Sequence, residues 1–315
     1  MKVAQIQKFG GPEVIEIVDI EKPFDSAQGR PTPKGQVLVK VYASSVNPFD
    51  YKLRNGAMKI NFPFTMGLDV AGVVTEVGEG VENVSVGNKV YGSAASLAGA
   101  TGGFAEFAVV PTGIIAKIPN NIDFNQAAAV VLTGCSAVQA LLEHLELKSG
   151  QKVLIHGGAG GIGTMAIQIA KSLGAYVATT VTGDGIEYVK KLGADEVIDY
   201  QNQQFQEIIK EYDGVYDTVG GEVFEKSFEV LKKNGVLVSM VAHDEKKLAE
   251  KYGVKVISQF TKVTTERLNI LAQYIENGAI KVHIDKIYPF DNIREAFVEQ
   301  EGGHVLGKIV ISINH

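Results

Sequence analysis

The segment from Lys152 to Thr180 constrains the fold of this chain more than any other. A short apolar run leads into the glycine-rich turn Gly157-Gly-Ala-Gly-Gly-Ile-Gly163, which is followed by apolar residues at helical spacing and by a second β run. This order is typical of a βαβ unit that binds a dinucleotide, because the N–H groups at the start of the helix favour a pyrophosphate. The alternative is a glycine turn in an α/β protein without such a ligand.

The spacing of the glycines supports the first interpretation. In the pattern Gly-x-Gly-x-x-Gly, the glycines let the backbone approach the phosphates and let the helix pack closely on the sheet. The residues predicted to contact the phosphates are Gly158, Ala159, Gly160, Gly161, Ile162 and Gly163.

Composition excludes several other classes of protein. The length of 315 residues suits two domains, and the net charge of −6 does not favour nucleic acid as a partner. We find no uninterrupted apolar run of about 20 residues and therefore expect no membrane partner. The first residues enter an alternating strand directly, so we expect no signal peptide. A single cysteine, Cys135, fits a reducing compartment, and we expect a cytoplasmic protein.

Metal-binding patterns are missing from the sequence. One cysteine is too few for a structural zinc site, and the histidines show no His-x-x-x-His spacing. The histidines stand at His144, His156, His243, His283, His304 and His315. We therefore expect no metal.

The pattern of expected secondary structure changes once along the chain. From Val37 to Val110, short alternating strands separated by Gly and Pro indicate a compact, barrel-like β domain. From Asn125, strands and helices alternate as in a doubly wound parallel sheet. The last strand returns to the first domain, so we expect one domain from residues 1–124 and 256–315 and a nucleotide-binding domain from residues 125–255.

Five segments, in the same order, resemble one family. They are Asn47-Pro-Phe-Asp50, Gly67-Leu-Asp69, Gly102-Gly-Phe-Ala-Glu-Phe107, Gly157–Gly163 and Gly307-Lys-Ile-Val310. The chain resembles the medium-chain dehydrogenase/reductases, in particular the zinc-free quinone oxidoreductase branch that includes zeta-crystallin. The resemblance implies an α/β fold in which a GroES-like, β-barrel-type catalytic domain is joined to a doubly wound Rossmann domain.

The differences from the zinc enzymes of this superfamily indicate the chemistry. Those enzymes carry a cysteine ligand where this chain has Val46-Asn47, and Gly-His-Glu where it has Gly67-Leu-Asp69. The resemblance therefore implies hydride transfer from a reduced nicotinamide to a small electrophile, either a quinone or the β-carbon of an α,β-unsaturated carbonyl compound. The protein then has to orient the partners and hydrogen-bond the developing oxyanion.

The resemblance implies three catalytic residues. Asn47 would lie beside the nicotinamide ribose, although it could also be only a turn residue before Pro48. Asp50 would orient the same loop. Lys52 stands where several relatives have tyrosine, and it could bond the ribose, polarise the substrate carbonyl, or be a solvated surface lysine.

Further residues are expected to contact the cofactor. Ser136 aligns with a threonine that contacts the nicotinamide carboxamide in relatives, with Thr133 as the nearby alternative and helix capping as the purely structural one. The resemblance adds Thr180, Val241 and Lys308 to the cofactor-binding residues.

The end of the second strand of the βαβ unit favours NADPH over NADH. NAD enzymes place a carboxylate there for the ribose 2′-OH, whereas this chain has Thr182, which would not repel a 2′-phosphate. Tyr200 resembles a tyrosine that flanks this phosphate. Asp184 lies close by and Gly185 replaces a lysine of some relatives, for which Lys190 or Lys191 could compensate.

Alternatives to this function remain at this point. The chain could reduce another carbonyl compound, or bind NADPH without turnover as a redox sensor or a lens-type structural protein. Members of the family commonly pair the edge strands of two nucleotide-binding domains. We therefore expect a homodimer, with Val236–Val241 near such an edge.

Overall fold

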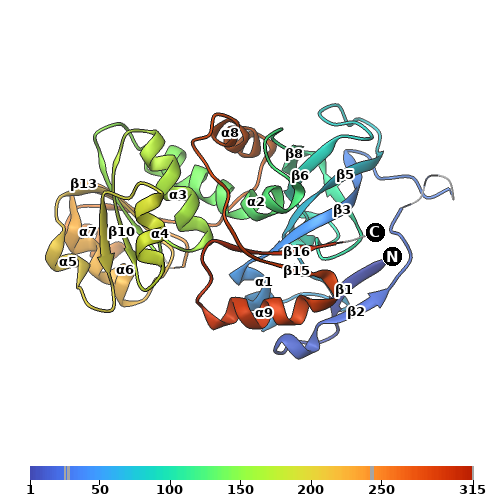
Figure 1. Cartoon of the computed structure of the whole chain (residues 1–315), viewed down its shortest axis with the longest axis horizontal. Coiled ribbons are helices and arrows are strands. Elements are labelled where there is room, and N and C mark those ends of the chain that lie inside the picture. The colour runs from blue at the N-terminus through green and yellow to red at the C-terminus, as the bar shows by residue number, and fades with distance from the viewer. Residues whose placement is uncertain (25, 27–28, 242–244, 314–315) are drawn as a thin grey trace. The chain divides into compact units, whose positions relative to one another are not determined.

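The computed structural model describes residues 1–24, 26, 29–241 and 245–313 (Figure 1). His243 and His315 lie outside the described residues, as does part of the Phe24–Gln36 segment. The chain divides into two compact units. Unit 1 consists of Met1–Leu132, Val263–Glu276 and Val282–His315, and unit 2 of Thr133–Lys262 and Asn277–Lys281. The boundaries differ from the expected ones, because residues 125–132 belong to unit 1 and residues 256–262 and 277–281 to unit 2.

Unit 1 is built on β-sheets. A seven-stranded sheet has the order β15-β16-β3-β5-β6-β8, with β7 paired to β3, and a three-stranded sheet has the order β2-β1-β4. The strands are β1 (Lys2–Ile6), β2 (Glu16–Asp19), β3 (Gln36–Val46), β4 (Phe64–Thr65), β5 (Asp69–Val77), β6 (Lys89–Ser93), β7 (Phe107–Pro111), β8 (Ile115–Lys117), β15 (Ile284–Pro289) and β16 (Lys308–Ser312). All pairings are antiparallel except that of β15 with β16.

One pairing in this sheet brings distant parts of the chain together. Strand β16 runs antiparallel to β3, with Ile309 opposite Val46 and Ile311 opposite Ser44. The start of β16 therefore lies beside the end of β3, where α1 (Pro48–Arg54) begins. Strand β5 pairs with the other side of β3. Three segments far apart in sequence thus meet at one end of β3.

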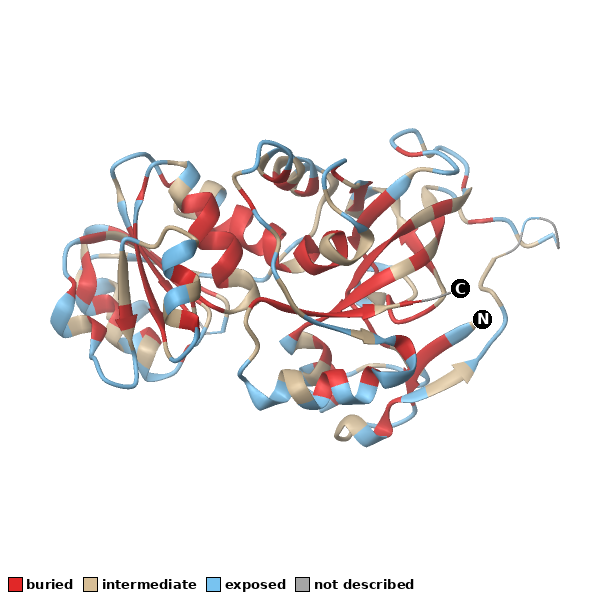
Figure 2. Ribbon diagram, viewed as in Figure 1, coloured by how far each residue is buried: buried red, intermediate tan, exposed pale blue. Residues whose placement is uncertain are grey.

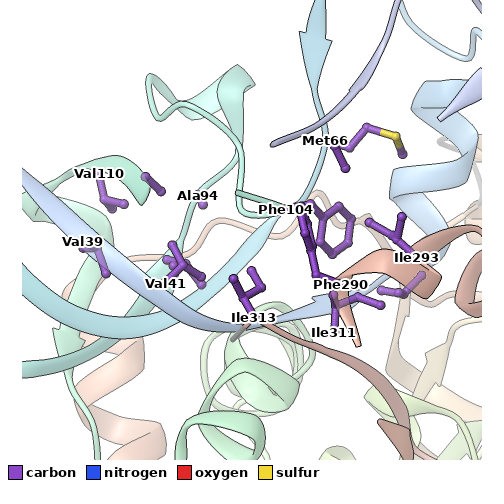
Figure 3. Packing of buried hydrophobic residues seen from close by; sticks show 14 of the residues in the cluster. Val39, Val41, Met66, Ala94, Phe104, Val110, Phe290, Ile293, Ile311 and Ile313 are labelled. Atoms are coloured by element: carbon purple, nitrogen blue, oxygen red, sulfur yellow. The ribbon is translucent and has the colours of Figure 1, made fainter. Parts of the chain in front are cut away.

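The core of unit 1 follows from the alternation seen in its strands (Figure 3). Val39 and Val41 point to one face of β3, and Ile309 and Ile311 do the same on β16, because side chains alternate between the faces of a strand. Phe104 lies among them and meets Phe297 edge to face, with ring centroids 5.9 Å apart. Phe297 belongs to α9 (Ile293–Gly302), so α9 covers this core.

Besides α1 and α9, the described part of unit 1 contains one longer helix, α8, several single-turn helices and the start of α2. The remaining helices of unit 1 are α8 (Thr265–Glu276), η1 (Pro12–Val14), η3 (Ser96–Ala98), η4 (Thr112–Ile114) and η7 (Phe290–Asn292). Helix α2 (Phe124–Val138) begins in unit 1 and continues as the π-helical segment η5 (Gln139–His144) in unit 2.

Unit 2 contains a six-stranded parallel sheet in the order β11-β10-β9-β12-β13-β14. The strands are β9 (Lys152–His156), β10 (Tyr176–Val181), β11 (Glu196–Asp199), β12 (Tyr212–Asp217), β13 (Leu231–Ser239) and β14 (Lys255–Ser258). The helices are α3 (Gly161–Ser172), α4 (Gly185–Lys191), α5 (Phe205–Ile208), α6 (Glu222–Ser227), η6 (Phe228–Val230) and α7 (Lys246–Tyr252). The central strands β9, β10 and β12 are mostly buried, whereas α4 alternates between buried and exposed residues (Figure 2).

This strand order is that of a doubly wound Rossmann sheet, and the predicted fold class is confirmed. The order of the strands reverses between β9 and β12, and ligands of such sheets bind beyond the carboxyl ends of the strands at that place. Strand β14 forms one edge of this sheet. Val236, which we expected near an edge, lies on β13, the neighbour of this edge strand.

One helix of the described part of the chain is long and apolar enough to cross a membrane by length and composition. It runs from Phe124 to His144, through α2 and η5, with a mean hydropathy of 1.3 over its best window. Polar residues interrupt it, which is why no uninterrupted apolar run is visible in the sequence. Of its most apolar stretch, 78% is buried inside the protein, as in the core helices of soluble proteins.

Candidate active site and nucleotide site

Asn47 stands at the junction of β3 and α1, where the chain turns from strand to helix. Its backbone is extended (φ −121°, ψ 149°), and Pro48 follows at the first helical position, where a missing N–H costs nothing. The carboxylate of Asp50, three residues on, accepts the backbone N–H of Asn47 at 2.9 Å. Asp50 therefore fixes the start of α1.

The side-chain amide of Asn47 joins a carboxylate to an ammonium group. Its Nδ2 donates to Oδ2 of Asp69 at 2.7 Å and to the carbonyl oxygen of Ser45 at 3.3 Å. Its Oδ1 accepts from Nζ of Lys308 at 2.6 Å. The charges on either side set the orientation of the amide, because only its NH2 can face the carboxylate and only its oxygen can face the ammonium.

Asp69 and Ser45 complete this group of side chains, which we call the Asp69–Asn47–Lys308 cluster. Oδ2 of Asp69 accepts the hydroxyl of Ser45 at 2.6 Å, and Oδ1 accepts the backbone N–H of Leu132 at 3.2 Å. Neither Asp69 nor Ser45 was predicted to have a role. The available signal was a carboxylate directly before the apolar run Val70–Val74 of strand β5.

Burial shifts the pKa values of the charged groups around the cluster. Asp50, Asp69 and Lys308 are each at most 4% exposed. Desolvation raises the pKa of Asp50 to about 7, helped by the negative charge of Asp69 and opposed by the N–H of Asn47 and the charge of Lys308. Desolvation also raises the pKa of Asp69, which Lys308 opposes.

The same effect acts on Lys308 with the opposite sign. Desolvation lowers the pKa of its ammonium to about 8, and the two carboxylates oppose this shift. Asp50 and Lys308 therefore both titrate close to neutral pH. Groups with such pKa values are typical of sites that bind charge or move protons.

Lys52, the third residue predicted to be catalytic, lies elsewhere on the same helix. It is exposed on α1 and takes no part in the hydrogen bonds described for the cluster. The structure thus brings together Asn47, Asp50 and Lys308 from the predicted residues of unit 1, and leaves Lys52 in solvent.

In unit 2, the glycine turn has the geometry of a phosphate site. Gly157 has a φ of +71°, and a Cβ on Gly158 would lie 2.0 Å from Oγ1 of Thr179. A Cβ on Gly163 would lie 2.3 Å from the carbonyl oxygen of Gly157. Helix α3 begins after Gly160, and no side chain of the described residues caps it. Its first N–H groups are therefore available to an anion.

The side chain of Thr180 hydrogen-bonds this turn. Its hydroxyl lies 3.0 Å from Nδ1 of His156 and accepts the N–H of Gly157 at 3.3 Å. The other ring nitrogen of His156 lies 3.0 Å from Oγ of Ser227. Burial lowers the pKa of His156 to about 4, although Asp217 opposes the shift. His156 is therefore neutral at physiological pH, with both nitrogens engaged.

Ser136 lies inside unit 2 and is fully buried. Its hydroxyl is 2.8 Å from the hydroxyl of Tyr216 and 2.9 Å from that of Thr261, and Nε2 of Gln259 donates to it at 3.3 Å. These contacts occupy the oxygen that the resemblance assigns to the carboxamide. Val241, in contrast, is 39% exposed just beyond β13.

The region predicted to recognise the ribose holds one unexpected carboxylate. Thr182 follows β10 and hydrogen-bonds Asp199 at the end of β11; this bond and that of Asn202 keep the pKa of Asp199 low. Tyr200, the next residue, is 56% exposed. Lys190 pairs with Glu187 at 2.7 Å on α4, so this lysine is already engaged.

Comparison with known proteins now identifies the family. Residues 33–120 match the family model of the alcohol dehydrogenase GroES-like domain, and residues 192–311 match that of the zinc-binding dehydrogenases. An NADPH-dependent alkenal/one oxidoreductase of chloroplasts from Arabidopsis thaliana is 34% identical over 99% of this chain and 79% of its own length. A 2-methylene-furan-3-one reductase from Solanum lycopersicum is 35% identical over 93% of this chain and 76% of its own.

Solved structures of quinone oxidoreductases are similar to this chain over nearly its whole length. The quinone oxidoreductase from Coxiella burnetii has a TM-score of 0.90 at 33% identity, covering 100% of this chain and 99% of its own. The Escherichia coli quinone oxidoreductase complexed with NADPH has a TM-score of 0.88 at 28% identity, covering 99% and 100%. The chain belongs to the quinone oxidoreductase branch of the medium-chain dehydrogenase/reductases. The predicted family membership is confirmed.

One family model names zinc, but the donor set of this member of the branch does not fit that metal. An amide and the side chain of Leu68 stand where the resemblance places ligands in the zinc enzymes. The ammonium of Lys308 lies beside the carboxylates and would repel a cation. Across the residues that the structure describes, no group of three or more His, Cys, Asp or Glu side chains is placed to hold a metal ion.

The glycine turn yields a prediction on stability. We expect Gly163→Ala to destabilise the protein by about 1–3 kcal/mol, because the new methyl group would collide with the backbone of the turn. The matched control is Gly160→Ala, whose Cβ would meet nothing closer than the carbonyl oxygen of Gly157 at 3.4 Å. Urea unfolding measures both variants. Equal midpoints for the two would contradict this account of the turn.

Asp50 yields a prediction on pH dependence. Its pKa is raised from 3.8 to about 7 on folding, so the folded state binds more protons than the unfolded state between these values. The contribution of Asp50 to stability is therefore fully present below pH 4 and is lost as pH rises through 7. In Asp50→Asn the stability should fall less over this range than in the wild type. Denaturant unfolding at a series of pH values tests this, and parallel curves would refute it.

Proposed function

We propose that this protein reduces quinones and α,β-unsaturated carbonyl compounds with NADPH. The observation that carries the proposal is the Asp69–Asn47–Lys308 cluster, whose Asn47 and Asp69 lie in the two segments that resemble the metal-binding segments of the zinc enzymes. An ammonium held there can hydrogen-bond an oxygen that gains negative charge. It cannot generate an alkoxide from an alcohol as a Lewis acid does.

The nucleotide site fits NADPH. The cofactor, when bound, supplies the hydride. The uncapped start of α3 suits the diphosphate, and the absence of a Cβ at Gly158 and Gly163 lets the turn close around it. The exposed Tyr200 is suited to the 2′-phosphate, and so is Thr182 once its hydroxyl leaves the carboxylate of Asp199.

The names of the relatives indicate the class of substrate. One relative is named for alkenals and alkenones, another for a 2-methylene-furan-3-one, and several for quinones. All these compounds have an electron-poor carbon conjugated to a carbonyl group. Addition of hydride to this carbon places negative charge on the carbonyl oxygen, and one proton completes the reduction. A donor for that oxygen is what the buried ammonium of Lys308 offers.

The activity and the cofactor preference can be tested together. We expect the protein to oxidise NADPH in the presence of a quinone or a short enone, and to be slower with NADH. Thr182→Asp should lower the NADPH-to-NADH ratio of kcat/KM by roughly tenfold or more, because it adds a carboxylate beside the 2′-phosphate. Asn234→Asp, an equal charge change outside the nucleotide site, controls for net charge. Turnover of neither substrate with either cofactor would refute the proposed function.

For the assembly, we propose a homodimer that pairs two copies of β14. This strand forms one edge of the described six-stranded sheet, and an exposed edge can pair with another strand. Static light scattering should give twice the chain mass of 33.8 kDa. A mass of one chain at micromolar concentration would rule the dimer out.

A further inference from the structure

The amide of Asn47 has no hydrogen to offer a ligand. Both hydrogens of Nδ2 are donated within the chain, to Asp69 and to the carbonyl oxygen of Ser45. The backbone N–H is donated to Asp50. On the acceptor side, Oδ1 accepts from Lys308, and the side chain also accepts the backbone N–H of Asp50 in the capping box of α1. Asn47 therefore cannot donate a hydrogen bond to a ligand in this conformation.

Lys308 has the donor that Asn47 lacks. An ammonium group carries three N–H bonds. Two of them are directed to the carbonyl oxygen of Val46 and to Oδ1 of Asn47, each at 2.6 Å. The third meets no acceptor in the hydrogen bonds described for this part of the chain. The two short bonds fix where this third N–H points.

We propose that Asp69 is a positioning residue of the active site. By fixing the amide of Asn47 it aims the ammonium of Lys308, which is the hydrogen-bond donor of the cluster to an oxygen of the bound ligand. This inference rests on the proposed function for its ligand. The oxygen belongs either to the substrate carbonyl or to the ribose of the cofactor, and the two cases are separated below.

The hydrogen bonds around Asp69 show why it has to be a carboxylate. Its two oxygens accept from Ser45, Asn47 and the backbone N–H of Leu132, and all three partners are donors. An asparagine at position 69 would have an NH2 group in place of one carboxylate oxygen. This NH2 would face either the N–H of Leu132 or the donors of Ser45 and Asn47, and no hydrogen bond could form there. If the amide of Asn47 then turned over, its NH2 would face the ammonium of Lys308. A change at Asp69 is thus transmitted to Lys308 without direct contact.

Two carboxylates keep the ammonium charged. Asp69, from β5, and Asp50, from α1, both raise the pKa of Lys308, against the desolvation that lowers it to about 8. Strand β3 contributes neutral groups, and β15 places Ile284 opposite Lys308. The imidazole of His283, before β15, lies against Gly307 and is a further titratable group next to this position. Loss of the charge of Asp69 lowers the pKa of Lys308 further.

The first test uses the ligand-free protein, so that it does not depend on turnover. Lysines labelled with ¹³C at Cε are titrated by NMR, and the signal missing in Lys308→Arg identifies Lys308. We expect Lys308 to titrate near pH 8 in the wild type and at lower pH in Asp69→Asn. Asp217→Asn removes a buried carboxylate in unit 2 and should leave this titration unchanged.

An unchanged titration of Lys308 in folded Asp69→Asn overturns the proposal. If that variant does not fold, Asp69→Glu replaces it. The longer side chain keeps the charge but cannot preserve all three hydrogen bonds. In this variant the Lys308 signal should change its chemical shift while it still titrates near pH 8. A Lys308 signal identical to that of the wild type in Asp69→Glu overturns the proposal as well.

The second test is the pH profile of kcat/KM for NADPH-dependent reduction. We expect activity to fall above about pH 8 in the wild type, as Lys308 loses its proton, and at lower pH in Asp69→Asn. Lys308→Arg should abolish this loss of activity at high pH, because a guanidinium stays charged. At neutral pH, Asp69→Asn should lose roughly tenfold in kcat/KM, as when a hydrogen bond to a charged group is lost. If Asp69→Asn lowers kcat/KM but activity still falls at the same pH as in the wild type, Asp69 has a merely structural role.

The affinity for NADPH identifies the oxygen. If it belongs to the ribose, Lys308→Met raises the Kd for NADPH, measured by fluorescence without substrate. If it belongs to the substrate, the Kd stays constant while kcat/KM falls. A variant with both values unchanged overturns the assignment of Lys308 as the donor. If no substrate is turned over at all, the proposed function fails, but the titration of Lys308 still decides the link to Asp69.

Discussion

The amide of Asn47 is the contact on which the arrangement of unit 1 around its polar site depends. It lies between a buried carboxylate and a buried ammonium, and it bonds both. Charges in an apolar interior are costly unless they are paired and hydrogen-bonded. The amide satisfies both charges with one side chain. The antiparallel pairing of β16 with β3 makes this possible, because it brings Lys308 to the residue that ends β3.

The cost of this burial is visible in the pKa values. Asp50 and Lys308 are each shifted toward the neutral form, to about 7 and about 8. A protein selected only for stability would avoid such groups, since a buried ion pair is often no better than apolar residues of the same volume. Their presence at the junction of β3 and α1 therefore indicates function. A reductase that places charge on a carbonyl oxygen needs a donor of this kind, held in place before the ligand arrives.

Unit 2 is suited to bind a polyanion, and it offers backbone N–H groups for this rather than side chains. Its glycines are required by contacts within the protein: a Cβ at Gly158 or Gly163 would collide with neighbouring atoms before any ligand is present. The same close packing exposes the first N–H groups of α3. His156, the last residue of β9, and Thr180, its partner on β10, contact each other below the turn, and the hydroxyl of Thr180 accepts the N–H of Gly157. The nucleotide site is therefore set by local structure, and the polar site of unit 1 by long-range pairing.

This difference explains what the sequence determined by itself. The glycine turn, the alternation of strands and helices, and the family were all readable from the chain, because each depends on residues close together in sequence. Asn47 and Asp50 were found through one short motif. The role of Asp69 and the link from Asn47 to Lys308 were not, since they join residues 22 and 261 positions apart. Only the pairing of β3 with β5 and β16 brings these groups together, and only burial there gives them unusual pKa values. Desolvation depends on every atom packed around a group, which no local pattern encodes.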